Sequence, residues 1–212
     1  MRRSRSRKNL VRETMWSRTY QVGKKAFAYE SKFKAGGLSI SVGELTPMWD
    51  SWGDSGKLDF ASAFSKKVDI AGRDEKVLEF LMARGDERVL STIALCLTRH
   101  SDRKMVLNFL LERLRSGSEP KGNFIQALAM LGDLEAVAGI REVYGQVSTE
   151  INRRGADADK WLILDFVVCC SALSRLEDSP SYREQIKPFL NHPNEAVRNI
   201  SKLWFEGGWP PG

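Results

Sequence analysis

Three seven-residue stretches decide the fold: Cys96–Asp102 reads CLTRHSD, Ala127–Asp133 reads ALAMLGD, and Ala172–Asp178 reads ALSRLED. Each begins with a small residue and Leu, passes through a position typical of a helix end, and finishes at Asp. Their starts lie at residues 96, 127 and 172, that is 31 and then 45 residues apart. One helix of about ten to fourteen residues, a turn and a second helix use roughly 30 to 45 residues. The spacing therefore predicts repeated helical hairpins.

The predicted fold is an all-α solenoid of about four helical hairpins, with a small N-terminal β-hairpin and loop as a cap. A single hairpin cannot bury its apolar stripe alone, so hairpins are expected to stack side by side. The predicted segments are a basic arm at residues 1–19, a β-hairpin and Trp-rich loop at 20–56, the solenoid at 57–207 and a tail at 208–212.

Apolar residues recur every three or four positions within each predicted helix, as an amphipathic helix requires. Val106, Leu110 and Leu114 form one such stripe. Ser101 or Asp102 precedes it as an N-cap. The small first residue of each seven-residue stretch is expected to let neighbouring helices approach closely.

The long spacing before the third stretch comes from Gln146–Asp159, which we expect to form a loop, because insertions in solenoids map to loops. Trp161–Leu173 follows and is apolar nearly all round, which predicts a helix buried on both sides. Asp165 within it needs a hydrogen-bonding or ionic partner if it is buried. Ser181 and Glu184 predict a capping box at the start of a later helix.

The residues before the solenoid show a different period. From Ala26 to Val42, apolar and polar residues alternate around a Gly-Gly pair, which predicts two strands joined as a hairpin. Thr46–Gly56 reads TPMWDSWGDSG, and its Gly, Pro, Asp and Ser content predicts a loop. It contains two tryptophans, Trp49 and Trp52. We expect both to pack against the solenoid, and the alternative is that they are exposed and bind a partner.

The net charge of +6 is unevenly distributed. Residues 1–34 carry eleven Lys or Arg and two Glu, a net of +9, so the remaining 178 residues carry a net of −3. A basic arm of this kind either contacts the phosphates of a nucleic acid or, as we expect, is a solvated tail. The Arg- and Ser-rich start also imitates an organelle transit peptide, but it lacks the apolar stretch of a secretory signal.

Composition argues against several classes of function. The three cysteines lie among apolar neighbours in helical patterns, which predicts reduced core residues in a reducing compartment such as the cytoplasm. No run of residues reaches the roughly 20 apolar positions of a membrane span. The two histidines are too few for a His-rich metal site, and no phosphate loop, CxxC motif or nucleophile elbow is present. We therefore expect no enzyme activity, no cofactor and no membrane, and the oligomeric state is left open.

The last predicted hairpin, IKPFLNHPNEAVRNISKLWF at Ile186–Phe205, resembles a HEAT or HEAT-like repeat. In such repeats a helix ending in Leu is followed by an Asp or Asn turn, then Val-Arg, and then small and large apolar residues at fixed steps. The matching positions are Asn194, Val197, Arg198, Ser201 and Phe205. FLMARGDERVLSTIALCL at Phe80–Leu97 resembles the same pattern, with Leu90 where Arg is usual. The resemblance covers about residues 74–206 and implies a binding scaffold rather than a catalyst.

The resemblance also implies a concave groove lined by the second helix of each hairpin. Several polar residues of this chain are therefore expected to face a groove, or alternatively to form an ordinary solvated surface. They are Arg99, Gln126, Asp165, Arg198, Asn199 and Lys202. Together with Trp49 and Trp52 they form the set of candidate binding residues.

These features lead to the hypothesis of a non-catalytic module that binds a macromolecular partner, which we expect to be a protein. With its small size, its mildly acidic body and its predicted N-terminal cap, the chain resembles bacterial immunity or adaptor proteins, whose acidic grooves block basic toxins. The alternative is a nucleic-acid-binding protein similar to alkylpurine DNA glycosylases, for which the basic arm, Trp16, Trp161 and Asp165 are the relevant residues. A third hypothesis is a chaperone-like or lyase-like HEAT protein that acts on a cofactor-bearing subunit.

Overall fold

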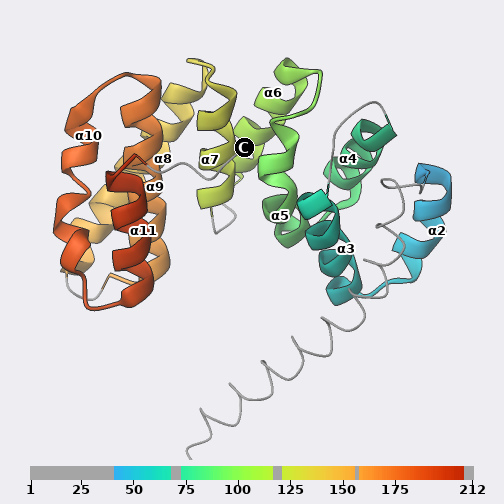
Figure 1. Ribbon diagram of the computed structural model, residues 1–212, viewed down its shortest axis with the longest axis horizontal. Helices are drawn as coiled ribbons and strands as arrows, with labels where there is room; N and C mark the ends of the chain where they lie inside the picture. The colour runs from blue at the N-terminus through green and yellow to red at the C-terminus, as the bar shows by residue number, and fades with distance from the viewer. Residues whose placement is uncertain (1–40, 68–72, 117–120, 156–157, 208–212) are drawn as a thin grey trace, which may run out of the picture. The chain divides into compact units, whose positions relative to one another are not determined.

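The structure, a computed structural model, describes residues 41–67, 73–116, 121–155 and 158–207. The described residues form helices and no strand, which is compatible with a helical solenoid. The chain divides into two compact units, Met1–Ile93 and Ala94–Gly212. The helices, labelled in Figure 1, are α2 (Val42–Ser51), α3 (Asp54–Lys67), α4 (Arg73–Arg84), α5 (Glu87–Leu97), α6 (Arg103–Arg115), α7 (Gly122–Leu131), α8 (Ala136–Arg154), α9 (Lys160–Leu176), α10 (Pro180–Glu184), the 3-10 helix η2 (Lys187–Asn191) and α11 (Glu195–Phe205).

The segment predicted as a Trp-rich loop, Thr46–Gly56, is mostly helical. Helix α2 runs through its first part, and α3 begins at Asp54. The loop prediction was therefore wrong, and so was the strand assigned to Val42, which begins α2. The remainder of the predicted β-hairpin lies outside the described residues.

A capping box explains why α2 forms where a loop was expected. The Ser41 hydroxyl accepts a hydrogen bond from the Glu44 backbone N–H at 3.3 Å, and the Glu44 carboxylate accepts one from the Ser41 backbone N–H at 2.8 Å. Leu45 and Trp49 lie one turn apart on the same face, and both are buried. Pro47 has no backbone N–H and so cannot donate a hydrogen bond within the helix. The free energy gained by burying this face offsets the loss of that bond.

Aromatic side chains form much of the core of the first unit. The centroid of the Trp49 ring lies 6.4 Å from that of Phe60 in α3 and 5.6 Å from that of Phe80 in α4. Trp52 lies 5.6 Å from Phe60, and Phe60 stacks on Phe64 at 6.1 Å. Tilted and edge-on ring pairs of this kind add about 0.5–1.5 kcal/mol each to the stabilisation from area burial. The cluster therefore joins α2, α3 and α4.

Helix α9 is central to the second unit. It packs against α7, α8, α10 and α11, whereas α6 packs against α7 and α8. Every α9 residue from Asp165 to Ser174 is buried. The prediction of a helix buried on both sides is confirmed, because neighbours on several sides leave little of α9 in contact with water.

The three seven-residue stretches each end one helix and lead into the next. Their first residues, Cys96, Ala127 and Ala172, are all buried, as expected where helices approach closely. The Asp102 carboxylate accepts a hydrogen bond from the Met105 backbone N–H at 2.9 Å. Asp102 thus caps α6, which confirms one of the two residues predicted for this role.

The insertion predicted as a loop, Gln146–Asp159, is largely helical. Helix α8 runs from Ala136 to Arg154, so the extra residues mainly lengthen this helix. Val147 continues its buried face, which is why the helix does not end at Gln146. Gly155 follows with a φ of 57°, a conformation that Gly adopts without strain.

The start of α10 also differs from the prediction. The helix begins at Pro180, directly after the N-cap residue Ser179. Pro is favoured at the first helical position because its fixed φ suits the helix and its missing N–H would have no partner there. Ser181 consequently lies inside α10, with its hydroxyl 2.8 Å from that of Ser179, and the predicted capping box was wrong.

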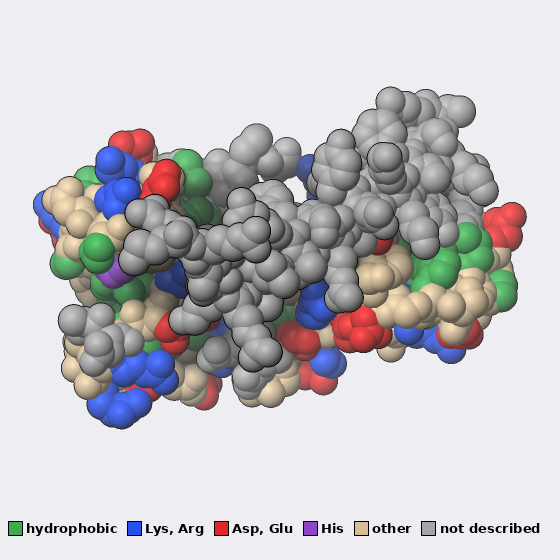
Figure 2. Space-filling view, turned by 90° about the horizontal axis from the view of Figure 1, so that it is seen from below, with side chains coloured by type: hydrophobic (Ala, Val, Ile, Leu, Met, Phe, Trp, Pro, Cys, Tyr) green, Lys and Arg blue, Asp and Glu red, His purple; other side chains and the backbone are tan. Residues whose placement is uncertain are grey.

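Ion pairs link successive helices of the second unit. Lys104 of α6 pairs with Glu135 at 2.5 Å, and Arg141 of α8 pairs with Glu177 at 2.6 Å. Three of these four side chains are more than half exposed, and pairs at the surface contribute about 0–1 kcal/mol each. On the side drawn in Figure 2, basic and acidic side chains are interspersed over the described surface. That part of the described surface therefore has no broad basic field of the kind that binds nucleic acid.

Candidate interaction surface

A chain of polar contacts fixes the first turn of α9. Asp159 Oδ1 accepts hydrogen bonds from the backbone N–H groups of Trp161 and Leu162 at 2.9 and 3.1 Å and so caps the helix. Asp159 Oδ2 accepts a hydrogen bond from Arg154 Nη1 at 3.3 Å. Arg154 Nε in turn donates to Glu150 Oε1 at 2.5 Å. The last turn of α8 thereby holds the first turn of α9.

Trp161 projects from this end of α9 and is 56% exposed. The Lys160 ammonium lies 4.8 Å from the centroid of its ring, which is a cation–π contact. Leu164, Val168 and Arg175 follow Trp161 at steps of three, four and seven residues, so they lie on the same side of the helix. Leu164 is half-buried and Arg175 is exposed. Val168 is buried, so this side of α9 is open only at its two ends, at Trp161 and Leu164 in the first turn and at Arg175 in the last.

A buried carboxylate follows Trp161 by one turn of α9. Asp165 is 7% exposed, and its Oδ1 adjoins Gly122, the first residue of α7. A Cβ added to Gly122 would come within 3.3 Å of that oxygen, so the missing side chain makes room for the carboxylate. The N-terminus of a helix carries a partial positive charge that favours a carboxylate. Asp165 thus lies where the start of α7 approaches α9, a position that favours a carboxylate over an apolar side chain.

Gln126 follows Gly122 by one helical turn and is buried. This spacing places it on the same side of α7 as Gly122, and α7 packs against α9. Two residues that were expected to face a groove, Gln126 and Asp165, thus lie at the buried contact between α7 and α9.

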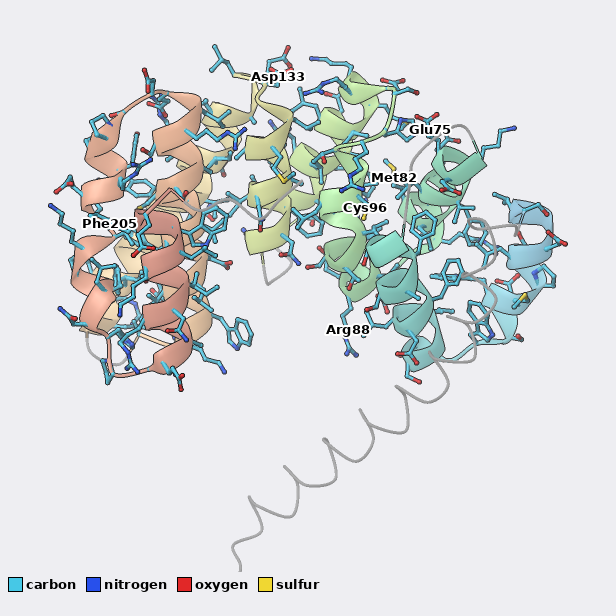
Figure 3. The ribbon with its side chains drawn as sticks, viewed as in Figure 1. Glu75, Met82, Arg88, Cys96, Asp133 and Phe205 are labelled. Atoms are coloured by element: carbon cyan, nitrogen blue, oxygen red, sulfur yellow. The ribbon has the colours of Figure 1, made fainter. Side chains whose placement is uncertain are left out.

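Two thiols follow Asp165 along α9. Cys169 and Cys170 are free and buried, and burial raises the pKa of Cys170 to about 12. Burial also raises the pKa of Cys169. Interactions with Cys170 and Asp165 raise this pKa further, whereas Lys121 lowers it. Cys96 of α5, labelled in Figure 3, is likewise buried. The predicted place of the three cysteines in the core is confirmed.

The predicted binding residues of α11 lie in two different environments. Arg198 Nη1 donates hydrogen bonds to two carbonyl oxygens of the preceding turn, at 2.8 and 2.9 Å, so this residue stabilises the turn. Asn199 and Lys202 are exposed. Leu203 lies beside them and is 44% exposed. The outer side of α11 is therefore polar with one large apolar side chain.

We define the α9–α11 surface as the exposed sides of these two helices, which pack against each other. Its exposed residues are Lys160, Trp161 and Arg175 in α9 and Glu195, Ala196, Asn199, Lys202 and Leu203 in α11. Among the described residues, three large apolar side chains are exposed, and two of them, Trp161 and Leu203, belong to this surface. The third is Leu134, in the turn between α7 and α8.

The remaining predicted binding residues lie elsewhere. Trp49 is buried and Trp52 half-buried within the aromatic cluster of the first unit. Arg99 is exposed in the turn that follows α5, outside the α9–α11 surface. The structure therefore leaves Asn199 and Lys202 as the predicted residues that belong to this surface.

Sequence reasoning connected Trp161 with nucleic-acid binding only and did not name Lys160, Leu164 or Leu203. Because α9 is apolar nearly all round, its periodicity does not show which side stays open. A signal for Leu203 was present, since α11 has a clearly amphipathic sequence and Leu203 falls outside its buried face.

Within the described ranges, no group of three or more His, Cys, Asp and Glu side chains is arranged to hold a metal ion. Within those same ranges, no helix combines the length and the apolar character needed to cross a membrane. Comparison with known protein families, with curated proteins and with solved structures finds no match for this chain. A function therefore has to be inferred from the residues themselves.

Proposed function

We propose that the chain is a non-catalytic, HEAT-like helical-repeat module that binds a protein partner, as adaptor and immunity-type proteins do. The observation that carries this proposal is the exposure of Trp161 and Leu203 on two adjacent helices. Trp is enriched among the residues that dominate the binding energy of protein interfaces. A protein-binding role accounts for both exposed side chains.

Contacts between the helices support the repeat arrangement. The helices α6 and α7 pack together, as do α8 and α9, and the two pairs also touch through α6 with α8 and α7 with α9. Stacked helical hairpins require contacts of this kind between like members of successive pairs. Asn194 caps α11 and Arg198 binds the turn before it, which are suitable roles for two positions that match the HEAT pattern.

The alternative of a protein similar to alkylpurine DNA glycosylases receives less support. Asp165, the acidic residue on which that hypothesis depends, is 7% exposed and lies against the start of α7. A carboxylate in this position stabilises the contact between two helices and is poorly placed to reach a base.

Affinity purification tests the proposed function. The tagged full-length chain is purified at moderate salt from the organism that encodes it, with and without nuclease treatment. We expect one protein to co-purify in stoichiometric amount and to survive nuclease. Recovery that disappears with nuclease, or the absence of any co-purifying protein, would overturn the proposal.

A further inference from the structure

The turn before α11 is held by the ring of His192. Its Nδ1 accepts a hydrogen bond from the Asn194 backbone N–H at 3.1 Å. Asn194 is the N-cap of α11, because its side-chain oxygen accepts hydrogen bonds from the backbone N–H groups of Ala196 and Val197 at 3.0 and 3.3 Å. The imidazole therefore positions the residue from which α11 begins.

We propose that His192 is an acid-sensitive switch that loosens α11 when its ring is protonated. A neutral imidazole that accepts a hydrogen bond at Nδ1 carries its own hydrogen on Nε2. A further proton can then be added only at Nδ1. An imidazolium has donors at both nitrogens and no acceptor, so protonation breaks the hydrogen bond from Asn194. The ring is half-buried, and histidines change charge between about pH 7 and pH 5.

The surroundings of the ring oppose this added charge. From the α11 side, Arg198 Nη1 donates hydrogen bonds to the carbonyl oxygens of His192 and Pro193, so a guanidinium already lies in the same turn. The N-terminus of α11 adds a partial positive charge. From η2 the ring meets an uncharged group, Phe189, with the two ring centroids 6.4 Å apart.

No carboxylate compensates for the added charge within the described part of the chain. Glu195 is the acidic residue nearest to His192 in the sequence, but it is exposed and forms no ion pair with the ring among the described residues. Unfolding separates the imidazolium from the guanidinium and from the helix N-terminus. Protonation therefore favours the open form, and stability is lost as the pH falls.

Helix α11 is the element that this switch controls. Val197, Ser201 and Trp204 form its buried side, and the helix packs against α9 and η2. Local opening costs less at the end of a stack of repeats than within it. A weaker start of α11 is therefore expected to increase the opening of this helix without unfolding α8 and α9.

Hydrogen exchange measured by mass spectrometry tests the switch on the full-length chain. Protection factors, which correct for the intrinsic pH dependence of exchange, are compared at pH 7 and pH 5. We expect protection of the α11 amides to fall by about three- to tenfold at pH 5, the effect of one hydrogen bond, while protection of the α8 amides stays within about twofold. Unchanged protection of α11, or an equal loss in α8, would overturn the proposal.

Substitution of His192 separates its protonation from other effects of acid. His192→Asn supplies a side-chain oxygen that accepts the same backbone N–H but does not titrate, so protection of α11 is expected to be equal at pH 7 and pH 5. His192→Ala lacks an acceptor, and low protection is expected at both pH values.

The matched control is His100→Asn. His100 Nδ1 accepts a hydrogen bond from the Asp102 backbone N–H at 3.0 Å in the turn before α6, so the two histidines make the same kind of contact. This variant is expected to keep the wild-type response of α11. An acid response of α11 that persists in His192→Asn, or that His100→Asn abolishes, would overturn the proposal.

The switch also has a consequence for binding. Asn199, Lys202 and Leu203 belong to α11, so a protein held by the α9–α11 surface is expected to dissociate more readily at pH 5. This consequence rests on the proposed function. The exchange experiment requires no partner, so its failure would overturn the switch and leave the proposed function standing.

Discussion

Gly122 of α7 adjoins Asp165 of α9 so closely that a Cβ added to the glycine would lie 3.3 Å from Asp165 Oδ1. The contact joins the first turn of one helix to the buried part of another. In a helix, Ala is ordinarily preferred over Gly by up to about 1 kcal/mol. Here the carboxylate occupies the space that a methyl group needs.

We therefore predict that Gly122→Ala lowers the free energy of unfolding by about 1 kcal/mol, because the buried carboxylate has to shift. In an Asp165→Ala background the same substitution is expected to be neutral or stabilising. The carboxylate is then absent, so the higher helix propensity of Ala determines the change in the free energy of unfolding. Urea unfolding of the four proteins measures the coupling between the two positions. Gly145→Ala in α8, where nothing lies within 4 Å of the added Cβ, is the matched control and is expected to stabilise. A stabilising effect of Gly122→Ala in the wild-type chain would contradict the contact.

Trp49 is expected to stabilise the first unit. Its ring contacts Phe60 and Phe80, and truncation of a buried Trp leaves a large cavity. Trp49→Ala should therefore lower the free energy of unfolding by about 3–5 kcal/mol in urea titrations. Trp161→Ala is the matched control, because a largely exposed Trp should change this quantity by no more than about 0.5 kcal/mol. Equal effects of the two substitutions would show that Trp49 is not a core residue.

The acid response of Glu150 follows from its two arginine neighbours. Hydrogen bonds from Arg153 and then Arg154 lower the pKa of Glu150 from 4.5 to about 2. Because the folded-state pKa lies below the unfolded-state pKa, the ionised carboxylate stabilises the end of α8 fully above about pH 4.5. This contribution is lost as the pH falls through about 2.

Carbon-13 NMR titration of the Glu150 carboxyl group checks this expectation. The midpoint is expected near 2 in the wild-type chain and closer to 4.5 in Arg153→Gln. Arg84→Gln removes an ion pair with Asp50 in the first unit and should leave the midpoint unchanged. An ordinary midpoint in the wild-type chain would show that the contacts of Glu150 do not persist in solution.

The three cysteines are expected to be unreactive in the folded protein. All are buried, and burial raises the pKa of each thiol, that of Cys170 to about 12. The thiolate is the reactive form, so a disulfide reagent at pH 8 should modify none of them in the native chain and all three in concentrated guanidinium. Rapid reaction of one thiol under native conditions would place that cysteine near solvent. Added reductant serves as the control for prior oxidation.

Where a helix has one clear apolar side, the sequence predicted it well. Val106, Leu110 and Leu114 are buried in α6 as expected, because their spacing determines which side faces the core. The cap at Asp102 was also predictable, since a carboxylate before an apolar stripe satisfies backbone N–H groups that have no other partner.

The errors in the helix assignments arose where composition was given more weight than spacing. Pro and Gly around Trp49 indicated a loop, yet Ser41 and Glu44 have the spacing of a capping box that begins α2. In α8, Val147 and Ile151 continue the apolar spacing beyond the expected end of the helix. Both signals were present in the sequence.

The open side of α9 could not be predicted, because it depends on which helices lie beside it. Trp161 belongs to a run that is apolar nearly all round, and it is exposed because the helices packed around α9 do not cover it. The same holds for Asp165, which lies against the start of α7, a helix more than thirty residues away in the sequence. The spacing of apolar residues along one helix does not show which other helices pack against it.

Because α9 contacts α10 and α11 as well as α7 and α8, it cannot be fully covered while the chain is still being made. As the polypeptide leaves the ribosome, α7 and α8 are available to α9 at once, but α11 follows only after residues 195–205 have emerged. A truncated product that stops before Glu195 therefore keeps an apolar side of α9 in water and is a target for chaperones and proteases. The burial of α9 is therefore complete only after this last described helix has been made.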